Sequence, residues 1–543
     1  MERRWYKWYD KQVSHSIYYP PTPLKDFFNY HAEKNPEKPY LIVNDIILPY
    51  GLCNSIARRF ANGLLKLGLK KGDRLGIMAP NVPQFILAEQ ACFKIGIIVV
   101  PINPLASIPE ITHQLNDSGA ETIVAMAVFS KGPIEILKTR TSPLKRVITF
   151  QVKSMQVEVE KADGIYDFDV IVAESADKEP DIKVLWSDTA LLQYTGGTTG
   201  VSKGCKLSNF NIVSISYQDV SWFAPLFKPG ELRTLAAIPI YHIFGFNCNV
   251  NVNLANGGAI ILVPQPTTDN ILDAINKHEP NFFAAVPTMI IGLNQHPETP
   301  KSKIRSIRGM ISGSSPLAVE AMKTFEELSG ATIIEGYGLS ETSNVLTCNP
   351  IFTKRKPGSV GLPWPDNDIR IVDLDAGTKE MPIGEAGELI AKGPTVMSEY
   401  WQNEKETAIA LREGWLYTGN IAYMDDDGYI FIVDRKKDMI LSSGFNVYPR
   451  EIDEVMYTNP KVLRACAIGV PDEKRGESIK LFLVLKPGET MAEKEVIDYC
   501  KERLSPYKVP KYVEFIDELP LTAIGKPDRK ALKQRELEKM KLK

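Results

Sequence analysis

Residue types that bind phosphate are concentrated in one short stretch of the chain, residues 194–204 (YTGGTTGVSKG). It holds four glycines, three threonines, one serine and Lys203. Glycines let backbone N–H groups approach an anion closely, hydroxyl groups add donors, and the lysine adds a positive charge. The stretch therefore predicts a cradle for phosphate. Taken alone, a glycine-rich surface loop is the alternative.

The common ATPase loop, GxxxxGK[ST], does not fit this stretch. Val201 and Ser202 separate Gly200 from Lys203, and a glycine follows the lysine. The spacing therefore indicates a phosphate site of another kind.

Length and composition narrow the class of protein. The 543 residues correspond to roughly three to four domain equivalents. The 64 Lys and Arg nearly balance the 66 Asp and Glu, so no overall field favours nucleic acid, and no nucleic-acid partner is expected. The seven cysteines are scattered singly without a CxxC pair, which argues against a disulfide framework and a zinc cage. Reduced and mostly buried thiols are expected.

No segment of the sequence predicts a membrane span or a secretion signal. The longest apolar runs, residues 95–102 and 259–264, are far shorter than the roughly 20 residues that cross a bilayer. The basic and aromatic N-terminus, residues 1–21, lacks an apolar core of signal-peptide type. We expect a cytoplasmic protein whose N-terminus packs on the body, with peripheral membrane contact as the less favoured alternative.

Strand-like and helix-like runs alternate through most of the chain. Residues 73–102 and 259–286 both follow a strand–helix–strand pattern, which predicts an α/β fold with parallel sheets covered by helices. From about residue 358 to residue 433, short strands and Gly or Pro turns predict a small β-barrel or meander. Beyond it, about a hundred residues predict a compact α+β unit. We therefore expect an N-terminal domain of residues 1–436 and a C-terminal domain of residues 437–543.

The phosphate stretch resembles the loop of the adenylate-forming superfamily, usually YTSGTTGxPKG, which includes acyl-CoA synthetases, luciferases and the adenylation domains of peptide synthetases. Seven further motifs of the superfamily follow in its order. They are residues 238–245 (IPIYHIFG), 312–317 (SGSSPL), 335–343 (EGYGLSETS), 387–401 (GELIAKGPTVMSEYW), 414–420 (GWLYTGN), 434–453 (DRKKDMILSSGFNVYPREID) and 520–532 (PLTAIGKPDRKAL). On these eight ordered motifs the chain is identified as a member.

The resemblance implies a set of ATP-binding residues. The superfamily joins a carboxylate to AMP from ATP and releases pyrophosphate, with adenine against Tyr337 and with Ser340 and Glu341 at the α-phosphate and Mg²⁺. A single glutamate suffices because magnesium keeps several waters. Without the motif, Glu341 would be read as a solvated surface acid. The implied ATP set is Thr195, Gly196, Gly197, Thr198, Thr199, Gly200, Lys203, Ser314, Ser315, Pro316, Glu335, Gly336, Tyr337, Asn420 and Arg435.

The resemblance also implies an acyl pocket formed by His242, Gly245, Ser312, Gly313 and Gly338. On its residues alone, His242 is as well explained as a core or pocket-wall histidine as by a functional role, because its neighbours are apolar. The resemblance places it at the acyl pocket, where it would gate entry.

In the superfamily the C-terminal domain rotates about a hinge that corresponds to Lys437. The rotation brings first Lys526, the implied catalytic lysine, and then a CoA-binding loop, Ser443, Gly444 and Phe445, to the active site. Without the motif, Lys526 would be read as a solvated lysine in a basic tail.

Two positions depart from the superfamily pattern. Ser202 replaces the usual proline before the lysine, which should change loop stiffness only. Asn420 replaces the usual aspartate, whose carboxylate accepts hydrogen bonds from both ribose hydroxyls. We expect the free energy of ATP binding to be weaker by about 1 kcal/mol, with Arg435 still contributing to ribose binding.

The sequence favours a free-standing acyl-CoA ligase over a peptide-synthetase module, because the C-terminal unit is full length and no carrier-protein domain follows. A medium- or long-chain fatty acid is the expected acid, and an aryl acid, as in the coumarate ligases, is the nearest alternative. A remote alternative is a non-catalytic ATP- or acyl-AMP-binding protein, but the retention of Lys203, Glu341, Arg435 and Lys526 argues against it. The sequence does not decide the oligomeric state, and a homodimer is one alternative.

Overall fold

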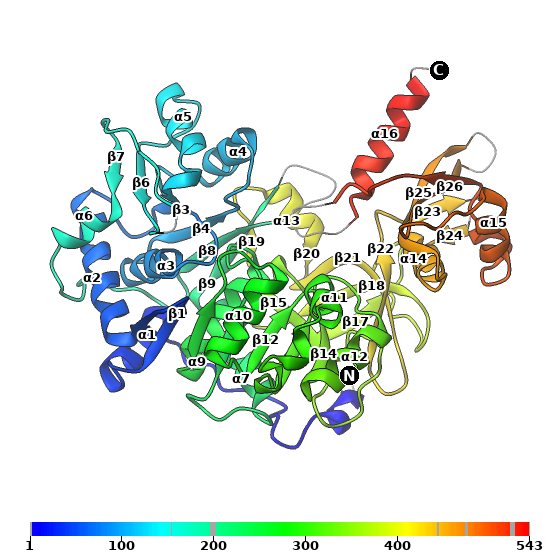
Figure 1. Ribbon diagram of the computed structural model, residues 1–543, viewed down its shortest axis with the longest axis horizontal. Helices are drawn as coiled ribbons and strands as arrows, with labels where there is room; N and C mark the ends of the chain where they lie inside the picture. The colour runs from blue at the N-terminus through cyan, green and yellow to red at the C-terminus, as the bar shows by residue number, and fades with distance from the viewer. Residues whose placement is uncertain are drawn as a thin grey trace.

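The computed structural model describes residues 3–153, 155–195, 202–442, 445–472, 476–521 and 527–541. Two sheets with helices around them form the large body, a smaller antiparallel sheet adjoins them, and a fourth sheet lies at one side near the C-terminus (Figure 1).

The eight-stranded sheet follows the order β19-β9-β8-β4-β3-β5-β6-β7. Its strands from β8 to β7 pair in parallel, and β9 and β19 pair antiparallel at the other edge. The bounds are β3 (Arg74–Met78), β4 (Ile98–Ile102), β5 (Thr122–Met126), β6 (Arg146–Phe150), β7 (Ile165–Asp167), β8 (Thr189–Tyr194), β9 (Gly204–Ser208) and β19 (Glu399–Tyr400).

The nine-stranded sheet follows the order β16-β15-β14-β13-β12-β10-β11-β1-β2, parallel from β14 to β1 and antiparallel at both ends. Its bounds are β1 (Pro39–Val43), β2 (Ile46–Pro49), β10 (Arg233–Ala236), β11 (Ala259–Leu262), β12 (Phe282–Ala285), β13 (Gly309–Ser312), β14 (Thr332–Leu339), β15 (Asn344–Cys348) and β16 (Leu362–Pro363). The predicted α/β fold with parallel sheets is confirmed.

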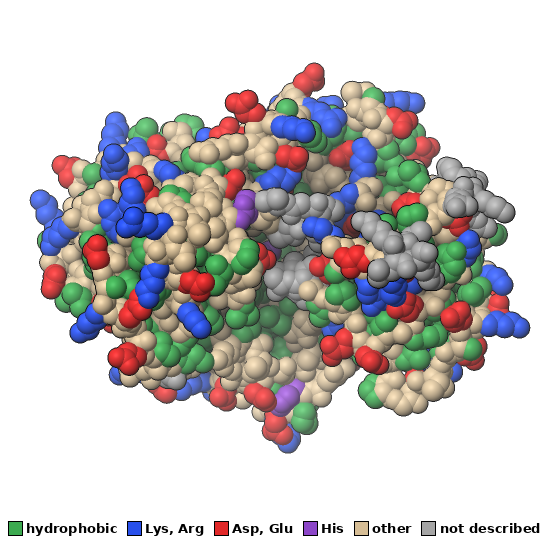
Figure 2. Space-filling view, turned by 90° about the horizontal axis from the view of Figure 1, so that it is seen from above, with side chains coloured by type: hydrophobic (Ala, Val, Ile, Leu, Met, Phe, Trp, Pro, Cys, Tyr) green, Lys and Arg blue, Asp and Glu red, His purple; other side chains and the backbone are tan. Residues whose placement is uncertain are grey.

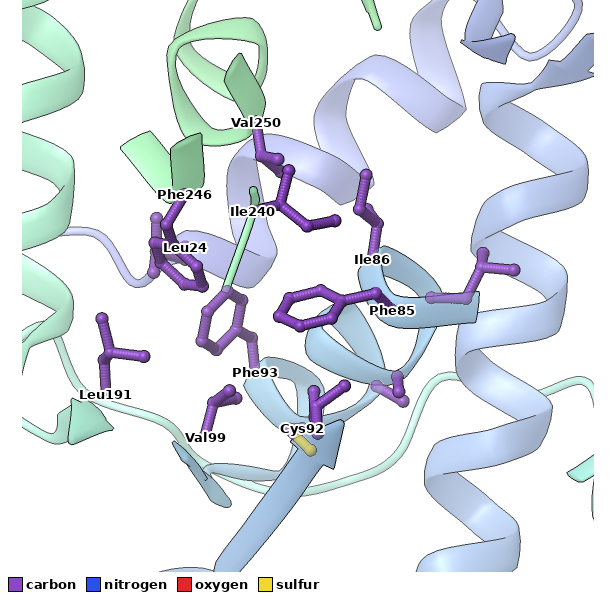
Figure 3. Close-up of a cluster of buried hydrophobic side chains, with 14 of the residues drawn as sticks. Leu24, Phe85, Ile86, Cys92, Phe93, Val99, Leu191, Ile240, Phe246 and Val250 are labelled. Carbon is purple, nitrogen blue, oxygen red and sulfur yellow. The ribbon is translucent and has the colours of Figure 1, made fainter. Parts of the chain in front are cut away.

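Helix α3 (Pro83–Ile95) lies at the centre of the largest core. All of its residues except Gln84 are buried, including the polar Glu89, Gln90 and Lys94. Its Phe85 and Phe93 point toward Ile240 and Phe246 of the chain that follows β10 (Figure 3). The helix therefore joins the two large sheets into one packed body.

Further helices cover these sheets. They are α1 (Leu24–Lys34), α2 (Tyr50–Lys66), α4 (Ile108–Ser118), α5 (Lys131–Thr139), α6 (Phe168–Ala173), α7 (Asn209–Phe223), α8 (Ile243–Gly245), α9 (Val252–Asn256), α10 (Thr268–His278), α11 (Pro287–Gln295), α12 (Val319–Ser329) and α13 (Glu404–Ala410). A π-helical segment, η3 (Phe246–Asn251), connects α8 to α9.

The β-rich segment forms an antiparallel sheet of β17 (Asp368–Val372), β18 (Gly387–Lys392), β20 (Leu411–Arg412), β21 (Trp415–Met424) and β22 (Ile430–Arg435). No pair between its described strands closes the sheet, so the barrel form of the prediction is wrong and the open form holds. The N-terminal segment lies against this sheet: Arg3 pairs with Asp368 of β17 at 2.8 Å, and Trp5 lies next to Gly428 in the turn between β21 and β22.

The aromatic N-terminus packs on the body, as predicted. Trp5 and Tyr9 are buried, and the Tyr9 ring meets the Trp222 ring edge-on at 5.0 Å between centroids. The buried Asp10 carboxylate accepts from the backbone N–H groups of residues 351–353 at 2.8–3.2 Å. Across the described ranges, no helix has both the length and the apolar character to cross a membrane. All seven cysteines are buried and free, as expected.

The last sheet consists of β23 (Ile440–Ser442), β24 (Phe445–Val447), β25 (Val462–Asp472), β26 (Gly476–Leu485) and β27 (Tyr512–Phe515). Helices α14 (Pro449–Tyr457), α15 (Glu493–Lys501) and α16 (Arg529–Lys541) accompany it, and it has its own apolar core (Figure 1). Lys437 lies in the turn between β22 and β23. The domain boundary at this residue stays a prediction.

Candidate active site

The predicted phosphate loop connects β8 to β9. Gly196, Gly197, Thr198, Thr199 and Gly200 lie outside the described residues, but both flanks are described. The Thr195 N–H donates to the Lys203 carbonyl at 3.0 Å, and the Ser202 hydroxyl donates to the Thr195 carbonyl at 2.6 Å. The base of the loop is therefore closed by its own hydrogen bonds. Ser202, which replaces the usual proline, makes one of them.

Helix α4 holds both flanks of the loop. The Tyr194 hydroxyl donates to Asp117 Oδ2 at 2.6 Å, and His113 Nε2 lies 2.8 Å from the Ser202 carbonyl oxygen. These contacts join residues about 77 and 89 positions apart. No local pattern in the sequence indicated them.

Lys203 and Glu341 both contact Tyr400, one at its ring and the other at its hydroxyl. The Lys203 ammonium pairs with the Glu406 carboxylate of α13 and lies 4.6 Å from the centre of the Tyr400 ring. The Tyr400 hydroxyl donates to Glu341 Oε1 at 2.7 Å. Tyr400 is the penultimate residue of a motif found in the sequence, although no role was predicted for it, and Glu406 was missed altogether.

Ser340 and Glu341 lie at the tip of the hairpin between β14 and β15, in a single 3₁₀ turn. The hairpin closes very tightly at Gly338, where an added Cβ would lie 1.5 Å from the Asn344 carbonyl oxygen. Only glycine fits such an approach. The hydroxyl and the carboxylate are thus carried by a short and rigid turn.

Asn420 and Arg435 face each other on β21 and β22. The Asn420 side-chain amide donates to the Tyr337 hydroxyl at 2.8 Å and to the Thr418 carbonyl at 3.1 Å. Desolvation raises the pKa of Tyr337, so its hydroxyl stays protonated at neutral pH. The amide therefore fixes the tyrosine predicted to contact adenine, and Asn420 Oδ1 is the side-chain atom left to accept from a ligand.

The expected hinge, Lys437, follows the end of β22, where Glu388 of β18 binds the neighbouring residues. The Lys436 ammonium pairs with Glu388 at 2.9 Å, and the same carboxylate accepts from the Gly419 N–H at 3.1 Å. Partial desolvation and the charges of Arg435 and Lys203 lower the pKa of Lys437, whereas Asp438 and Glu341 raise it. The Lys437 ammonium therefore lies within electrostatic reach of the residues predicted to bind ATP.

Glu335 holds the SGSSPL loop by a hydrogen bond to its last residue. Its buried carboxylate accepts from the Leu317 N–H at 3.2 Å, and desolvation raises its pKa. Ser314, in the same loop as Ser315 and Pro316, has a φ of 69°. The contact holds the SGSSPL loop in place beside Gly336 of β14.

Four of the five predicted acyl-pocket residues, His242, Gly245, Ser312 and Gly313, lie in two segments that contact each other, whereas Gly338 closes the hairpin of β14 and β15. His242 Nδ1 accepts from the Phe244 N–H at 3.3 Å and caps α8, which ends at Gly245. An added Cβ at Gly313, next to buried Ser312, would lie 3.1 Å from two carbons of the Phe244 ring. The α8 turn and the SGSSPL loop are therefore in direct contact.

Three of the predicted C-terminal site residues, Ser443, Gly444 and Lys526, lie outside the described residues, and only the backbone of Phe445 is described, at the start of β24. Figure 2 shows a hollow in one face of the molecule, between the large body and the C-terminal sheet, with charged side chains around it. The chain on either side of Lys526 is held by the pairing of Leu521 with Pro527 and by the Asp528 N–H, which donates to the Pro520 carbonyl at 2.8 Å.

No cluster of three or more metal-ligating side chains occurs in the part of the chain that is described. Glu341 nevertheless fits Mg²⁺ carried by ATP, since one carboxylate, waters and phosphate oxygens suffice. Tyr400 holds Oε1 of Glu341, which orients the carboxylate and leaves Oε2 for a ligand.

Comparisons with known families show which family the chain belongs to. A model described as AMP-binding enzyme matches residues 28–401, and one described as AMP-binding enzyme C-terminal domain matches residues 451–526. The chain therefore belongs to the AMP-binding enzyme family, within the adenylate-forming superfamily.

Individual proteins match over nearly the whole chain. A long-chain-fatty-acid–CoA ligase of Bacillus subtilis (strain 168) is 36% identical over 99% of both chains. A feruloyl-CoA synthase of Amycolatopsis sp. is 32% identical over 88% of this chain and 92% of its own length. ATP-bound MatB from Rhodopseudomonas palustris has the same fold, with a TM-score of 0.85 and 29% identity over 95% of this chain and 99% of MatB.

Proposed function

We propose that medium- or long-chain fatty acids are the acid substrates of this protein, which is an ATP-dependent acyl-CoA ligase. The observation that carries the proposal is the match to a long-chain-fatty-acid–CoA ligase at 36% identity over 99% of this chain. The full-length similarity to a long-chain-fatty-acid–CoA ligase supports a fatty acid more strongly than an aryl acid.

The first step makes the acid reactive. A carboxylate is a poor electrophile, so its oxygen attacks the α-phosphate of ATP, a P–O bond forms, and the bond to pyrophosphate breaks. Lys203 and the phosphate loop hold the leaving pyrophosphate, while Ser340 donates toward the α-phosphate. Glu341 holds Mg²⁺, which neutralises phosphate charge when bound.

The nucleoside part of ATP binds at the hairpin of β21 and β22. Tyr337 packs on adenine, and Asn420 with Arg435 binds the ribose. Because Asn420 donates to the Tyr337 hydroxyl, a change at the ribose contact also affects the adenine contact.

In the second step the CoA thiolate attacks the acyl carbon, the thioester bond forms, and AMP leaves with the electrons of the broken mixed anhydride. The C-terminal domain rotates about Lys437 between the steps, so that Lys526 serves the first and Ser443, Gly444 and Phe445 serve the second. The ion pair of Lys436 with Glu388 keeps the N-terminal side of the hinge fixed.

We expect Lys203→Ala to slow acyl-AMP formation by about ten- to hundredfold, the loss of one charge-assisted hydrogen bond. Thioester formation from supplied acyl-AMP should change much less, because pyrophosphate has left by then. Pyrophosphate release and single-turnover thioester assays measure the two steps. Glu406→Gln, which removes the partner and keeps the lysine, is the matched control. Equal damage to both steps in Lys203→Ala contradicts this division.

We expect Asn420→Asp to lower the KM for ATP by less than about tenfold and to leave acyl preference unchanged, since a carboxylate accepts better from the ribose. The Tyr337 hydroxyl can reverse its role and donate to the new carboxylate. Initial-rate kinetics with varied ATP measure the effect, and Tyr337→Phe reports the share of the hydroxyl. A large loss of activity in Asn420→Asp would show that the amide is required.

An acid panel tests the proposed function. Pyrophosphate release is measured with ATP, Mg²⁺ and CoA for saturated fatty acids of increasing chain length and for benzoate and coumarate. We expect the highest kcat/KM for a fatty acid. Selective use of an aryl acid would instead favour an aryl-CoA ligase, and release with none of the acids would favour a non-catalytic binding protein.

A further inference from the structure

The backbone shortly after Glu341 has an unusual conformation. Ser343 and Asn344 have φ angles of 57° and 134°, in the left-handed region that residues other than glycine rarely adopt. Both residues are buried, with exposed fractions of 0% and 5%. Strained backbone of this kind persists only where the surrounding structure holds it. The turn that carries Ser340 and Glu341 therefore needs contacts from outside the hairpin.

Two segments supply such contacts. One is the chain before β19. Its Thr395 carbonyl accepts from the Ser343 hydroxyl at 2.7 Å. Its Met397 N–H donates to the Glu341 carbonyl at 2.8 Å. The other is the π-helical segment η3, whose Asn247 side-chain amide donates to the Ser343 carbonyl. Ser343 is thus held through its hydroxyl by one segment and through its carbonyl by the other.

The orientation of the Asn247 amide is fixed within η3. Asn247 is 0% exposed, and its Oδ1 accepts from Asn251 Nδ2 at 3.2 Å, which leaves its own Nδ2 to donate to the hairpin. The adjacent Phe246 packs in the core around α3 (Figure 3), so the segment cannot shift easily. Single π-helical turns are frequent at functional sites. Both the position and the backbone of Asn247 therefore indicate more than a packing role.

Solvent cannot replace this contact. Because Ser343 is buried, its carbonyl would be left unpaired without the Asn247 amide, and an unpaired buried carbonyl is unfavourable. The backbone at Ser343 would then relax toward ordinary φ angles. Glu341 is only two residues earlier, so its carboxylate would move relative to Tyr400, which holds Oε1.

We propose that Asn247 is a positioning residue, which holds the strained turn and so places Glu341 for the Mg²⁺ carried by ATP and Ser340 for the α-phosphate. This inference rests on the proposed function. Asn247 acts through the Ser343 carbonyl and not by contact with ATP. Since η3 follows α8 directly, the residue also connects the acyl-pocket segment with the turn that would hold the metal.

The first test is the Kd of ATP without acid, measured by titration calorimetry with Mg²⁺ and with EDTA. Asn247→Ala should lose about tenfold of the affinity that Mg²⁺ adds in the wild type, because a displaced carboxylate loses a charge-assisted contact. The Kd of adenosine, which depends on Tyr337 and Asn420, should stay within about twofold and so show that the variant is folded. The kcat of pyrophosphate release should fall by about ten- to hundredfold.

Asn249→Ala is the matched control. Asn249 is also 0% exposed and lies two residues further along η3, but its amide donates to the Ile238 carbonyl at 3.4 Å. It should keep the effect of Mg²⁺ on ATP affinity within about twofold of the wild type. A purely structural role of these asparagines would instead give equal losses in the two variants.

Second changes at Ser343 test the strain itself. Glycine adopts a φ of 57° without strain, so Ser343→Gly should restore part of the Mg²⁺ effect to Asn247→Ala. Ser343→Ala removes the same hydroxyl but keeps the strain, and should restore none. The inference is overturned, while the proposed function stands, by an unchanged Mg²⁺ effect in Asn247→Ala, an equal loss in Asn249→Ala, or equal effects of the two second changes. A wild-type protein that releases no pyrophosphate with any fatty acid overturns both.

Discussion

Lys526→Ala is expected to reduce acyl-AMP formation by about a hundred- to thousandfold, the effect of removing one donor aimed at developing charge. The side chain would stabilise the charge that develops between the carboxylate and the α-phosphate. Conversion of supplied acyl-AMP and CoA to acyl-CoA should persist, because that step takes place after the domain has rotated. Lys526 itself lies outside the described residues, so this role is carried by the motif and by the held flanks on either side of it.

The two half-reactions are measured separately, by pyrophosphate release without CoA and by thioester formation from synthetic acyl-AMP. Lys530→Ala is the matched control, since Lys530 is an exposed lysine four residues further along the same tail. It should leave both half-reactions within about twofold, as for a typical surface substitution. A Lys526→Ala variant that forms acyl-AMP at the wild-type rate would remove Lys526 from the mechanism.

Lys437→Pro is expected to have the opposite pattern, with adenylation retained and thioester formation reduced by at least about tenfold. Proline fixes φ at the expected hinge, and so prevents the rotation that the second half-reaction requires. The neighbouring Lys436 pairs with Glu388 of β18, so this residue is attached to the sheet on the N-terminal side of the expected hinge.

Lys437→Ala separates the backbone effect from the side chain, because alanine leaves φ free. It should lose much less of the thioester step than Lys437→Pro does in the same assay. Equal failure of Lys526→Ala and Lys437→Pro in both half-reactions would mean that a mechanism with two conformations does not apply.

Strand–helix–strand periodicity was enough to predict the α/β fold. Residues 73–102 form β3, α3 and β4, and residues 259–286 contain β11, α10 and β12, because apolar runs of these lengths have few other ways to become buried. The closed barrel could not be judged in this way. Whether the last strands of a sheet pair depends on contacts with the rest of the chain, and here the N-terminal segment lies against this sheet.

The motifs located the candidate site but not its internal contacts. The sequence identified the motif that carries Ser340 and Glu341, but not the hairpin of β14 and β15 that holds them. The contacts of Tyr400 with Glu341 and of Lys203 with Glu406 join residues 59 and 203 positions apart. Their geometry follows from the packing of the whole body. The hydrogen bond from the Asn420 amide to the Tyr337 hydroxyl joins residues that are likewise distant in sequence. It gives Asn420 a contact that the sequence, which indicated only a weaker ribose contact, did not predict.

The central claim is that the acid is activated by transfer to the AMP part of ATP. It is tested most directly by a reaction with a fatty acid labelled with oxygen-18 in both carboxylate oxygens, ATP, Mg²⁺ and CoA, followed by mass spectrometry of the nucleotide. Attack on the α-phosphate predicts AMP that carries one labelled oxygen for each acyl-CoA formed. Unlabelled nucleotide together with ADP and labelled inorganic phosphate would contradict the account.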